Sequence, residues 1–262
     1  MKVYLVGPHS SWLGKDRNAM FDISNLYIME TFICTLGWMR PYINGTHPKA
    51  WNFMLDSGAF SYIGTGKKAR KTVDWNDYLR RYADYILSAK VKLFFELDID
   101  PVVGLPRVEQ MRKELESRVQ RPCIPVWHKA RGLDYWQGMV KDYDYVSIGA
   151  SGRHDSKWTR GKHGVAALRK LVDIAHNNNC QVHGLGYTKL FDDDWFDGRP
   201  RFDSVDSASW SWGNQGRFLS RFNGKRIDKI DKPVGTRLRS REVHLYNWLE
   251  WVKFQQYADH AL

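Results

Sequence analysis

The chain of 262 residues is long enough for one large α/β domain or two small ones, and its 43% hydrophobic residues argue against intrinsic disorder. Forty Lys and Arg against 29 Asp and Glu give a net charge of +11, which favours a polyanionic partner. No apolar run reaches the roughly 18 residues that a membrane span requires, and the first residues resemble a strand, not a signal peptide. We therefore expect a cytoplasmic protein that does not enter membranes.

Apolar runs of strand length alternate with amphipathic segments along most of the chain. Strands are predicted over residues 2–7, 51–55, 91–101, 122–128, 145–152, 181–186 and 201–207, with an eighth between 217 and 234. Helices are predicted over residues 18–38, 75–86, 105–119, 133–143, 165–175 and 240–258. Asp74 stands just before the second of these helices and is a typical N-cap residue.

This alternation is typical of βα units around a parallel sheet, and the length suits a single TIM-type (β/α)8 barrel, with residues 1–262 as one domain. An open doubly wound sheet is the competing architecture, but Gly7-Pro8-His9 lacks the spacing of a dinucleotide-binding turn. In such barrels the catalytic groups stand at the carboxyl ends of the strands. At those ends the sequence supplies acids, a histidine and glycines: Asp56, Asp98, His128, Gly149, Gly186 and Asp203.

The run Leu55-Asp56-Ser57-Gly58-Ala59-Phe60-Ser61 is the most informative of these strand ends. An apolar strand holds the backbone, a carboxylate follows at once, and Gly58 allows the chain to turn and approach a ligand closely. A plain turn is the alternative interpretation, since Asp-Ser-Gly is a favourable turn sequence. Other strands of the chain end in the same way, which favours a functional site.

Two carboxylates on one face of a barrel can cleave a glycosidic bond. One attacks the anomeric carbon to form a covalent ester with the sugar, and the other moves a proton to or from the leaving group. The N-glycosidic bond of a purine nucleotide is open to the same chemistry. Asp98 could then accept hydrogen bonds from the N–H edge of guanine, and Phe60 could stack on the base.

Two basic loops fall on the same predicted face, one after the strand that ends at Asp56 and one after the strand that ends near Gly149. We expect both loops to contact the phosphates of a nucleic acid, with a solvated surface loop as the alternative interpretation. The cations concerned are Lys67, Lys68, Arg70, Lys71, Arg153 and Lys157.

The sequence contains no motif for a structural metal or for a Walker A loop. Cys34, Cys123 and Cys180 are far apart and form no Cys/His cluster with zinc-ligand spacing. Scattered cysteines of this kind suit a reducing cytoplasm. The glycine-rich loop that starts at Gly64 lacks the first glycine of a Walker A motif, because Ser61 stands there.

Several of these motifs, in this order, resemble the tRNA-guanine transglycosylase family. Asp56-Ser57-Gly58-Ala59-Phe60 resembles that family's Asp-Ser-Gly-Gly-aromatic motif, and Phe202-Asp203-Ser204-Val205 resembles its Phe-Asp-Cys-Val nucleophile motif. Gly184-Leu185-Gly186 stands at the expected place before the second motif. Phe95-Glu96-Leu97-Asp98 is similar to the strand that reads guanine, and Ser147-Ile148-Gly149 to a glycine turn of the base pocket. The resemblance covers about residues 51–207.

The resemblance implies a barrel that needs no cofactor and works by double displacement. Asp203 would be the nucleophile that expels guanine, and Asp56 would move protons on the leaving and incoming bases. A free 7-deazaguanine would then attack the covalent intermediate. The residues implied for base binding are Ser57, Phe60, Asp98, Gly149 and Gly186, with Trp127 or His128 where the family has a glutamine.

Departures from the tRNA enzymes favour DNA as the substrate. No cysteine follows Cys180, so the zinc subdomain of the tRNA enzymes is missing, and Ala59 and Ser61 replace a glycine and a glutamine. A compact, basic and zinc-free chain resembles the phage branch of the family, which installs deazaguanines such as preQ0 in DNA. That would place the protein in the host cytoplasm. We expect exchange in DNA, with tRNA as the alternative.

Two other functions and a second nucleophile stay open. The same acids could serve a glycosidase or an N-glycosylase that uses water as acceptor, and a degenerate barrel could bind nucleic acid without catalysis. The charge of +11 argues against a neutral sugar, and clustered acids argue against a pure phosphate binder. Asp206, three residues beyond Asp203 and on the opposite face of an extended strand, is the alternative nucleophile.

Overall fold

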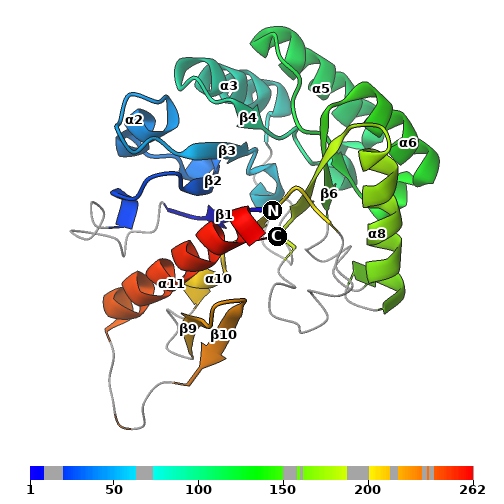
Figure 1. Cartoon of the computed structure of the whole chain (residues 1–262). Helices are drawn as coiled ribbons and strands as arrows, with labels where there is room; N and C mark the ends of the chain where they lie inside the picture. Colours follow the sequence, from blue (N-terminus) through cyan, green and yellow to red (C-terminus); the bar gives the residue numbers. More distant parts are fainter. Residues whose placement is uncertain are drawn as a thin grey trace.

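The computed structural model describes residues 1–8, 20–62, 73–149, 158–159, 162–187, 201–212, 218–231, 235 and 239–261. Eight parallel strands form its main sheet, in the order β4-β3-β2-β1-β8-β7-β6-β5 (Figure 1). These strands are β1 Lys2–Val6, β2 Tyr27–Thr31, β3 Asn52–Asp56, β4 Leu93–Phe94, β5 Val126–Trp127, β6 Tyr145–Gly149, β7 Gln181–Leu185 and β8 Ser204–Ser207.

The sheet curls until its two edge strands meet. A parallel bridge joins Phe95, just after β4, to Ile124, just before β5. Backbone hydrogen bonds from Glu96 N to Ile124 O (3.1 Å) and from Ile124 N to Phe94 O (2.8 Å) accompany this bridge. Strands that are neighbours in sequence are therefore neighbours in space, and the molecule has the TIM-like α/β architecture that the sequence predicts.

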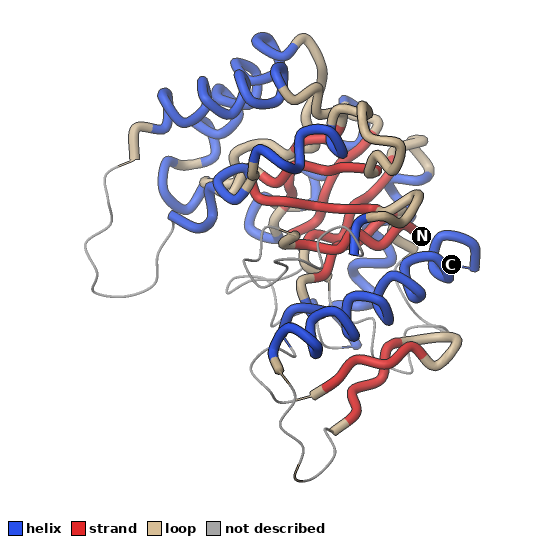
Figure 2. The backbone as a smooth tube through the Cα atoms, turned by 90° about the vertical axis from the view of Figure 1, so that its left-hand side faces the viewer, coloured by secondary structure: helices blue, strands red, loops and turns tan. Residues whose placement is uncertain are grey.

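Helices follow the strands and lie on the outside of the sheet (Figures 1 and 2). The described helices are α2 Arg40–Ile43, α3 Trp75–Ser88, α4 Asp100–Val103, α5 Leu105–Val119, α6 Leu133–Asp142, α8 Lys162–His176, α10 Ser209–Trp212 and α11 Ser240–Ala261. Asp74 caps α3 as predicted, because its side chain accepts hydrogen bonds from the backbone N–H groups of Asn76 and Asp77. Among the helices that the structure describes, none has the length and apolar character to cross a membrane.

The prediction of one helix over residues 18–38 is wrong. This segment contains β2, followed by the short 3-10 turns η2 Phe32–Cys34 and η3 Gly37–Met39. Asn25, with a φ of 61°, precedes β2, which then pairs with β1 and β3 on either side. A short apolar run such as residues 26–29 is compatible with a helix or a strand, and pairing with the two neighbouring strands makes it a strand here.

The predicted eighth strand between residues 217 and 234 is an antiparallel hairpin outside the barrel. Its strands are β9 Leu219–Phe222 and β10 Ile227–Ile230, which pair only with each other among the described strands. The hairpin packs beside α11, where Asn247 accepts a hydrogen bond from Ser220 N (2.8 Å) and Glu250 from Phe222 N (2.7 Å) (Figure 1). The barrel strand missing from the prediction is β2, whereas β8 at residues 204–207 lies within the predicted strand 201–207.

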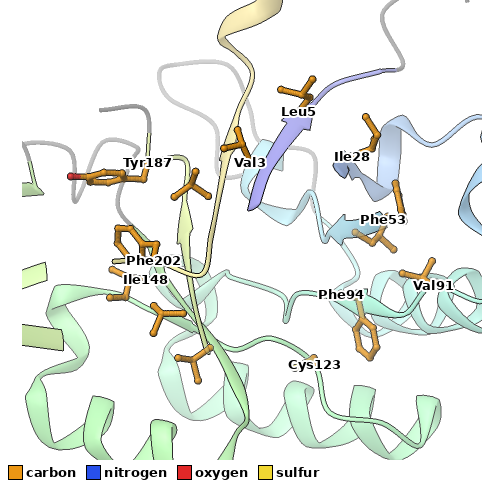
Figure 3. Packing of buried hydrophobic residues seen from close by; sticks show 14 of the residues in the cluster. Val3, Leu5, Ile28, Phe53, Val91, Phe94, Cys123, Ile148, Tyr187 and Phe202 are labelled. Carbon is orange, nitrogen blue, oxygen red and sulfur yellow. The ribbon is translucent and has the colours of Figure 1, made fainter. Parts of the chain in front are cut away.

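Apolar side chains fill one layer inside the sheet and another outside it. The inner cluster comprises Tyr4, Met29, Met54, Phe95, Ile124 and Val126. The outer cluster lies between strands and helices and includes Val3, Leu5, Ile28, Phe53, Phe94 and Ile148 (Figure 3). Successive residues of a strand point to opposite faces, so the two clusters alternate along each strand. Further along the strands, the inward positions carry polar residues, and these form the candidate site.

Candidate active site

Asp56 is the last residue of β3 and lies at the carboxyl end of the barrel. The Thr31 hydroxyl, at the end of the neighbouring β2, donates a hydrogen bond to Asp56 Oδ2 (3.4 Å), and the Gly58 backbone N–H donates to the same carboxylate. Gly58 has a φ of 70°, and a Cβ at this position would overlap the Thr31 side chain. The turn requires glycine for both reasons, and it holds the carboxylate in place.

The surroundings of Asp56 suit a group that exchanges protons. Burial and the negative charges of Asp206 and Asp98 together raise the pKa of Asp56 to about 7, although hydrogen bonds from Gly58 and Thr31 oppose the rise. A carboxyl group with this pKa gains and loses its proton near neutral pH, as a general acid and base must. The same interactions show that the three carboxylates lie near one another.

Asp206, in β8, is held by groups from β7 and the turn after it. Its Oδ1 accepts a hydrogen bond from the Gly186 backbone N–H (2.5 Å) and lies 3.1 Å from His183 Nε2. Gly186 has a φ of 64°, a conformation that glycine adopts without strain. Gly186, predicted from its place at a strand end, therefore acts on a neighbouring side chain through its backbone.

Asp203 lies at the other end of the barrel, so the prediction that it meets Asp56 is wrong. Asp203 immediately precedes β8, and its Oδ2 accepts a hydrogen bond from Val182 N (2.7 Å) and lies 3.0 Å from His176 Nε2. Its backbone oxygen accepts a hydrogen bond from Lys2 N, at the start of β1 (2.9 Å). All parallel strands begin at this end, whereas Asp56 stands where one of them finishes.

The register of β8 explains the difference. Ser204 pairs with Lys2 and Asp206 pairs with Tyr4 of β1, so β8 begins one residue after Asp203. At about 3.3 Å per residue, Asp206 lies roughly 10 Å further toward the carboxyl end, with its side chain on the opposite face of the strand. Asp206, the alternative nucleophile of the sequence interpretation, is therefore the aspartate that lies near Asp56.

Asp98 and His128 form a pair at the same end of the barrel. His128 Nε2 lies 2.8 and 2.9 Å from the two carboxylate oxygens of Asp98, and the two residues follow β4 and β5. A Cβ at Gly149, the last residue of β6, would overlap the His128 ring. The structure thus brings together three residues predicted to bind the base. Glycine is needed at position 149 because the imidazole packs against it, not because the chain turns there.

Trp127 lies on the outer face of the sheet, so its predicted contact with a base is wrong. Its side chain is buried, packs edge to face on Trp136 and Trp158, and donates a hydrogen bond from Nε1 to Gly132 O (2.8 Å). Because strand residues alternate between faces, an outward Trp127 leaves the next residue, His128, on the inner side. Of the two residues predicted to replace the family's glutamine, only His128 lies at the site.

Ser57 is built into the turn that carries Asp56. Its hydroxyl accepts a hydrogen bond from Ala59 N (3.4 Å), and its backbone oxygen accepts one from the Tyr78 hydroxyl (2.6 Å). Ser57 is 2% exposed, so these two hydrogen bonds lie inside the fold and stabilise the turn. Phe60 belongs to the 3-10 turn η4 Ala59–Tyr62, but the structure does not describe its side chain. The predicted phosphate-binding cations lie outside the described residues: Lys67, Lys68, Arg70, Lys71, Arg153 and Lys157.

A buried ionic network supports the site, and the sequence analysis does not predict it. Glu96 is fully buried and accepts hydrogen bonds from Arg112 Nε (2.6 Å), Arg131 Nη1 (3.0 Å) and Val126 N (2.8 Å). The bond to Val126 helps to join β4 to β5, where a single bridge connects the strands. The signal in the sequence is a lone acid within the apolar run of residues 93–97.

Arg131 connects the buried Glu96 to Asp98. Its side chain is 1% exposed, its Nε donates to Asp100 Oδ2 (3.2 Å), and its Nη2 lies 3.8 Å from Asp98 Oδ1. Ligand atoms of Asp98, Asp100 and His128 lie within 4.8 Å of one another, close enough to hold a metal ion. The Arg131 guanidinium pairs with Asp100 and lies near Asp98, so ion pairing already stabilises part of this trio.

Comparison with known proteins gives a distant structural likeness. No protein-family model matches the chain, and no curated protein matches it. The similar solved structures include an enolase protein from environmental genome shotgun sequencing of the Sargasso Sea, with a TM-score of 0.44 and 9% sequence identity. The match covers 79% of this chain, which spans about half of that enolase (54%). A likeness this distant carries no inference about activity, and the TIM-like architecture rests on the strand pairing described above.

Proposed function

We propose that the protein is a base-exchanging glycosyltransferase that replaces guanine in DNA with a free 7-deazaguanine through a covalent aspartyl-sugar intermediate. The observation that carries the proposal is a pair of unlike carboxylates at the carboxyl end of a TIM-like barrel. Asp56 gains and loses its proton near pH 7, whereas Asp206 accepts a backbone N–H and lies against His183. Carboxylates in such different surroundings suit different roles in one reaction.

The proposed reaction has two displacements at the anomeric carbon. Asp206 attacks this carbon and forms an ester bond, the bond to N9 of guanine breaks, and the acid form of Asp56 protonates the departing base. Asp56, now a carboxylate, then removes the proton from N9 of the incoming 7-deazaguanine. That nitrogen attacks the anomeric carbon, and the ester bond to Asp206 breaks.

Asp98 and His128 are the proposed base-recognition pair. An ionised Asp98 only accepts hydrogen bonds, and the edge of guanine offers N–H donors to it. Arg131 and His128 hold this carboxylate, and its charge is close enough to act on Asp56. Phe60 belongs to the turn that carries Asp56 and is the proposed stacking partner of the base.

A DNA substrate is proposed from charge and from the zinc-free sequence. The net charge of +11 suits a polyanion, and the residues after Cys180 contain no cysteine that could bind zinc as in the tRNA enzymes. The target base must leave the stack to reach the carboxylates, at a cost of roughly a few kcal/mol in duplex DNA. Single-stranded DNA avoids most of that cost, so we expect faster exchange on it.

Incorporation of labelled base into a polymer tests the proposal. The protein is incubated with labelled guanine or preQ0 and with single-stranded DNA, duplex DNA or tRNA, and label in the washed polymer is counted. We expect label in DNA. Label in tRNA alone would overturn the choice of DNA, and abasic sites without incorporation would identify an N-glycosylase instead. No incorporation and no abasic sites in any polymer would refute the proposed base exchange.

Mapping the covalent intermediate tests the role of Asp206. Omission of the incoming base and rapid denaturation trap the adduct, and mass spectrometry then locates the sugar on a peptide. No Lys or Arg separates Asp203 from Asp206, so fragment ions must distinguish the two aspartates. We expect the sugar on Asp206, and a sugar on Asp203 or Asp56 would overturn the assignment.

A further inference from the structure

Four polar side chains form a continuous line of hydrogen bonds through the barrel interior. Asp206 Oδ1 lies 3.1 Å from His183 Nε2, His183 Nδ1 lies 2.5 Å from Ser204 Oγ, and Ser204 Oγ lies 2.5 Å from the Tyr145 hydroxyl. Asp206 and Ser204 come from β8, His183 from β7, and Tyr145 from the first position of β6. The line therefore runs from the candidate site toward the amino end of the barrel.

The middle of this line is buried among aromatic rings. His183 and Ser204 are fully buried. The centre of the His183 ring lies 5.3 Å from that of Phe95 and 6.1 Å from that of Tyr4, both in edge contact. A buried polar atom without a hydrogen-bond partner is strongly unfavourable, so the fold must satisfy every member of the line.

The chemistry of the groups sets the direction in which they donate. An ionised Asp206 only accepts, so the nitrogen that faces it, His183 Nε2, must carry a hydrogen. In a neutral imidazole Nδ1 then accepts, which requires Ser204 to donate to it and Tyr145 to donate to Ser204. The titratable groups near His183 are Asp206 on β8, Tyr4 on β1 and, through Ser204, Tyr145 on β6. Burial raises the pKa of both tyrosines, which keeps both as neutral phenols.

We propose, on the basis of the function proposed above, that this line orients Asp206 as the attacking carboxylate, with every hydrogen bond donated toward it. His183 is then a positioning residue, held as the Nε2–H tautomer by Ser204 and Tyr145. The two donors to the carboxylate, Gly186 N–H and His183 Nε2–H, both bind Oδ1. Oδ2 accepts no hydrogen bond from the described residues, so Oδ2 is the oxygen left to attack the sugar.

The tautomer of His183 tests this proposal without any substrate. In protein with ¹⁵N-labelled histidine rings, protonated and unprotonated nitrogens give distinct signals, and the spectrum of His183→Gln identifies those of His183. We expect hydrogen on Nε2 and none on Nδ1 near neutral pH. In Ser204→Ala the Nδ1 signal should shift because it loses its donor. Hydrogen on Nδ1 alone, or on both nitrogens, in the wild type would overturn the proposal.

The rate of covalent adduct formation tests the effect on Asp206. His183→Leu removes a donor to a charged group and should slow this step about ten- to one-hundredfold, with little change in KM. His183→Gln supplies an amide N–H in place of Nε2–H and should restore most of the rate. His176→Leu, which alters the exposed Asp203 pair instead, is the matched control and should react at the wild-type rate.

The pH–rate profile separates positioning from packing. In His183→Leu the acid limb should move to higher pH, because the Asp206 carboxylate loses a donor that stabilises its charge. A uniform loss of rate without this shift and without rescue by His183→Gln would show that His183 only packs the barrel. Tyr145→Phe should give a smaller loss with the same shift, and it keeps the test available if His183→Leu does not fold. If no polymer accepts label in the wild type, the proposed function fails. The tautomer of His183 still shows whether the hydrogen bonds of the line are donated toward Asp206.

Discussion

The two ends of the barrel each carry an aspartate beside a histidine, and the surroundings make the pairs different. Toward the amino end, His176 Nε2 lies 3.0 Å from Asp203, with 37% and 32% of the side chains exposed. Toward the carboxyl end, His183 Nε2 lies 3.1 Å from Asp206, with 0% and 10% exposed. The distances are nearly equal, so distance does not distinguish the pairs. Burial does, because water screens the first pair and cannot screen the second.

The aspartate at the amino end has a structural task. Asp203 accepts a hydrogen bond from Val182 N, and its backbone oxygen accepts one from Lys2 N, so it connects the starts of β7, β8 and β1. At the carboxyl end, by contrast, burial and the charges of Asp206 and Asp98 together raise the pKa of Asp56. An aspartate next to a barrel strand therefore indicates a site residue only when it is known whether it lies at the amino or the carboxyl end of that strand.

Substitution of one aspartate at each end of the barrel tests this contrast most directly. Asp206→Asn removes the proposed nucleophile and should lower base exchange at least about ten-thousandfold. Asp203→Asn keeps an oxygen that accepts the hydrogen bond from Val182 N. Its rate of base exchange should stay within about twofold of the wild-type rate, because residue 203 lies far from the bond that breaks. Label incorporation into single-stranded DNA measures both. Equal losses in the two variants would refute the division between the ends.

Stability should depend far more on the buried ionic network than on an exposed pair of the same charge type. Glu96→Gln leaves the Arg112 and Arg131 guanidinium groups without their shared carboxylate and should lower the free energy of unfolding by about 3–5 kcal/mol. Glu114→Gln breaks an exposed pair with Arg118 on α5 and should cost about 1 kcal/mol or less. Urea unfolding of both variants checks the contrast, and similar losses would contradict it.

The pH dependence of stability should differ between the wild type and Asp56→Asn. The pKa of Asp56 is about 7 in the folded protein and near 4 when unfolded, so the folded state binds the extra proton between these pH values. Stability from this group is complete below about pH 4 and is lost as the pH rises to 7. Asp56→Asn avoids this loss, so it should match the wild type near pH 4 and exceed it by roughly 1–3 kcal/mol at pH 8, allowing for partial exposure.

Urea unfolding at the two pH values measures this difference, and the change of other carboxylates with pH cancels between the two proteins. An advantage of Asp56→Asn that is the same at both values would show that Asp56 ionises at its ordinary pKa. Because the charge of Asp206 contributes to the raised pKa of Asp56, the Asp206→Asn background should move the whole transition to lower pH.

The smallest expected effect concerns the packing of His128. Gly149→Ala places a methyl group where the His128 ring lies, so it should displace the ring from Asp98 and raise KM for the free base about tenfold with a smaller change in kcat. Gly138→Ala, in α6, meets no atom within 4 Å and should leave KM unchanged while adding up to about 1 kcal/mol of stability. Steady-state kinetics of base exchange at varied preQ0 concentration measure KM for the two variants. An unchanged KM in Gly149→Ala as well as in Gly138→Ala would show that His128 has no role in base recognition.

The sequence alone determined the features that depend on a few consecutive residues. Alternating apolar strands and amphipathic helices predicted the TIM-like architecture, and an acid followed by glycine at the end of an apolar run located the Asp56 turn. Strand periodicity, capping and the conformational freedom of glycine act within one turn or strand, so a single segment contains the whole signal.

Only the tertiary structure decided which aspartate and which face of a strand belong to the site. Pairing with β1 sets the register of β8 and places Asp206, not Asp203, near Asp56. Packing on α6 turns Trp127 outward and leaves His128 inside, and Glu96 meets Arg131 across 35 residues of sequence. These choices depend on contacts between segments that are distant in the chain, and no local pattern records the energy of such contacts.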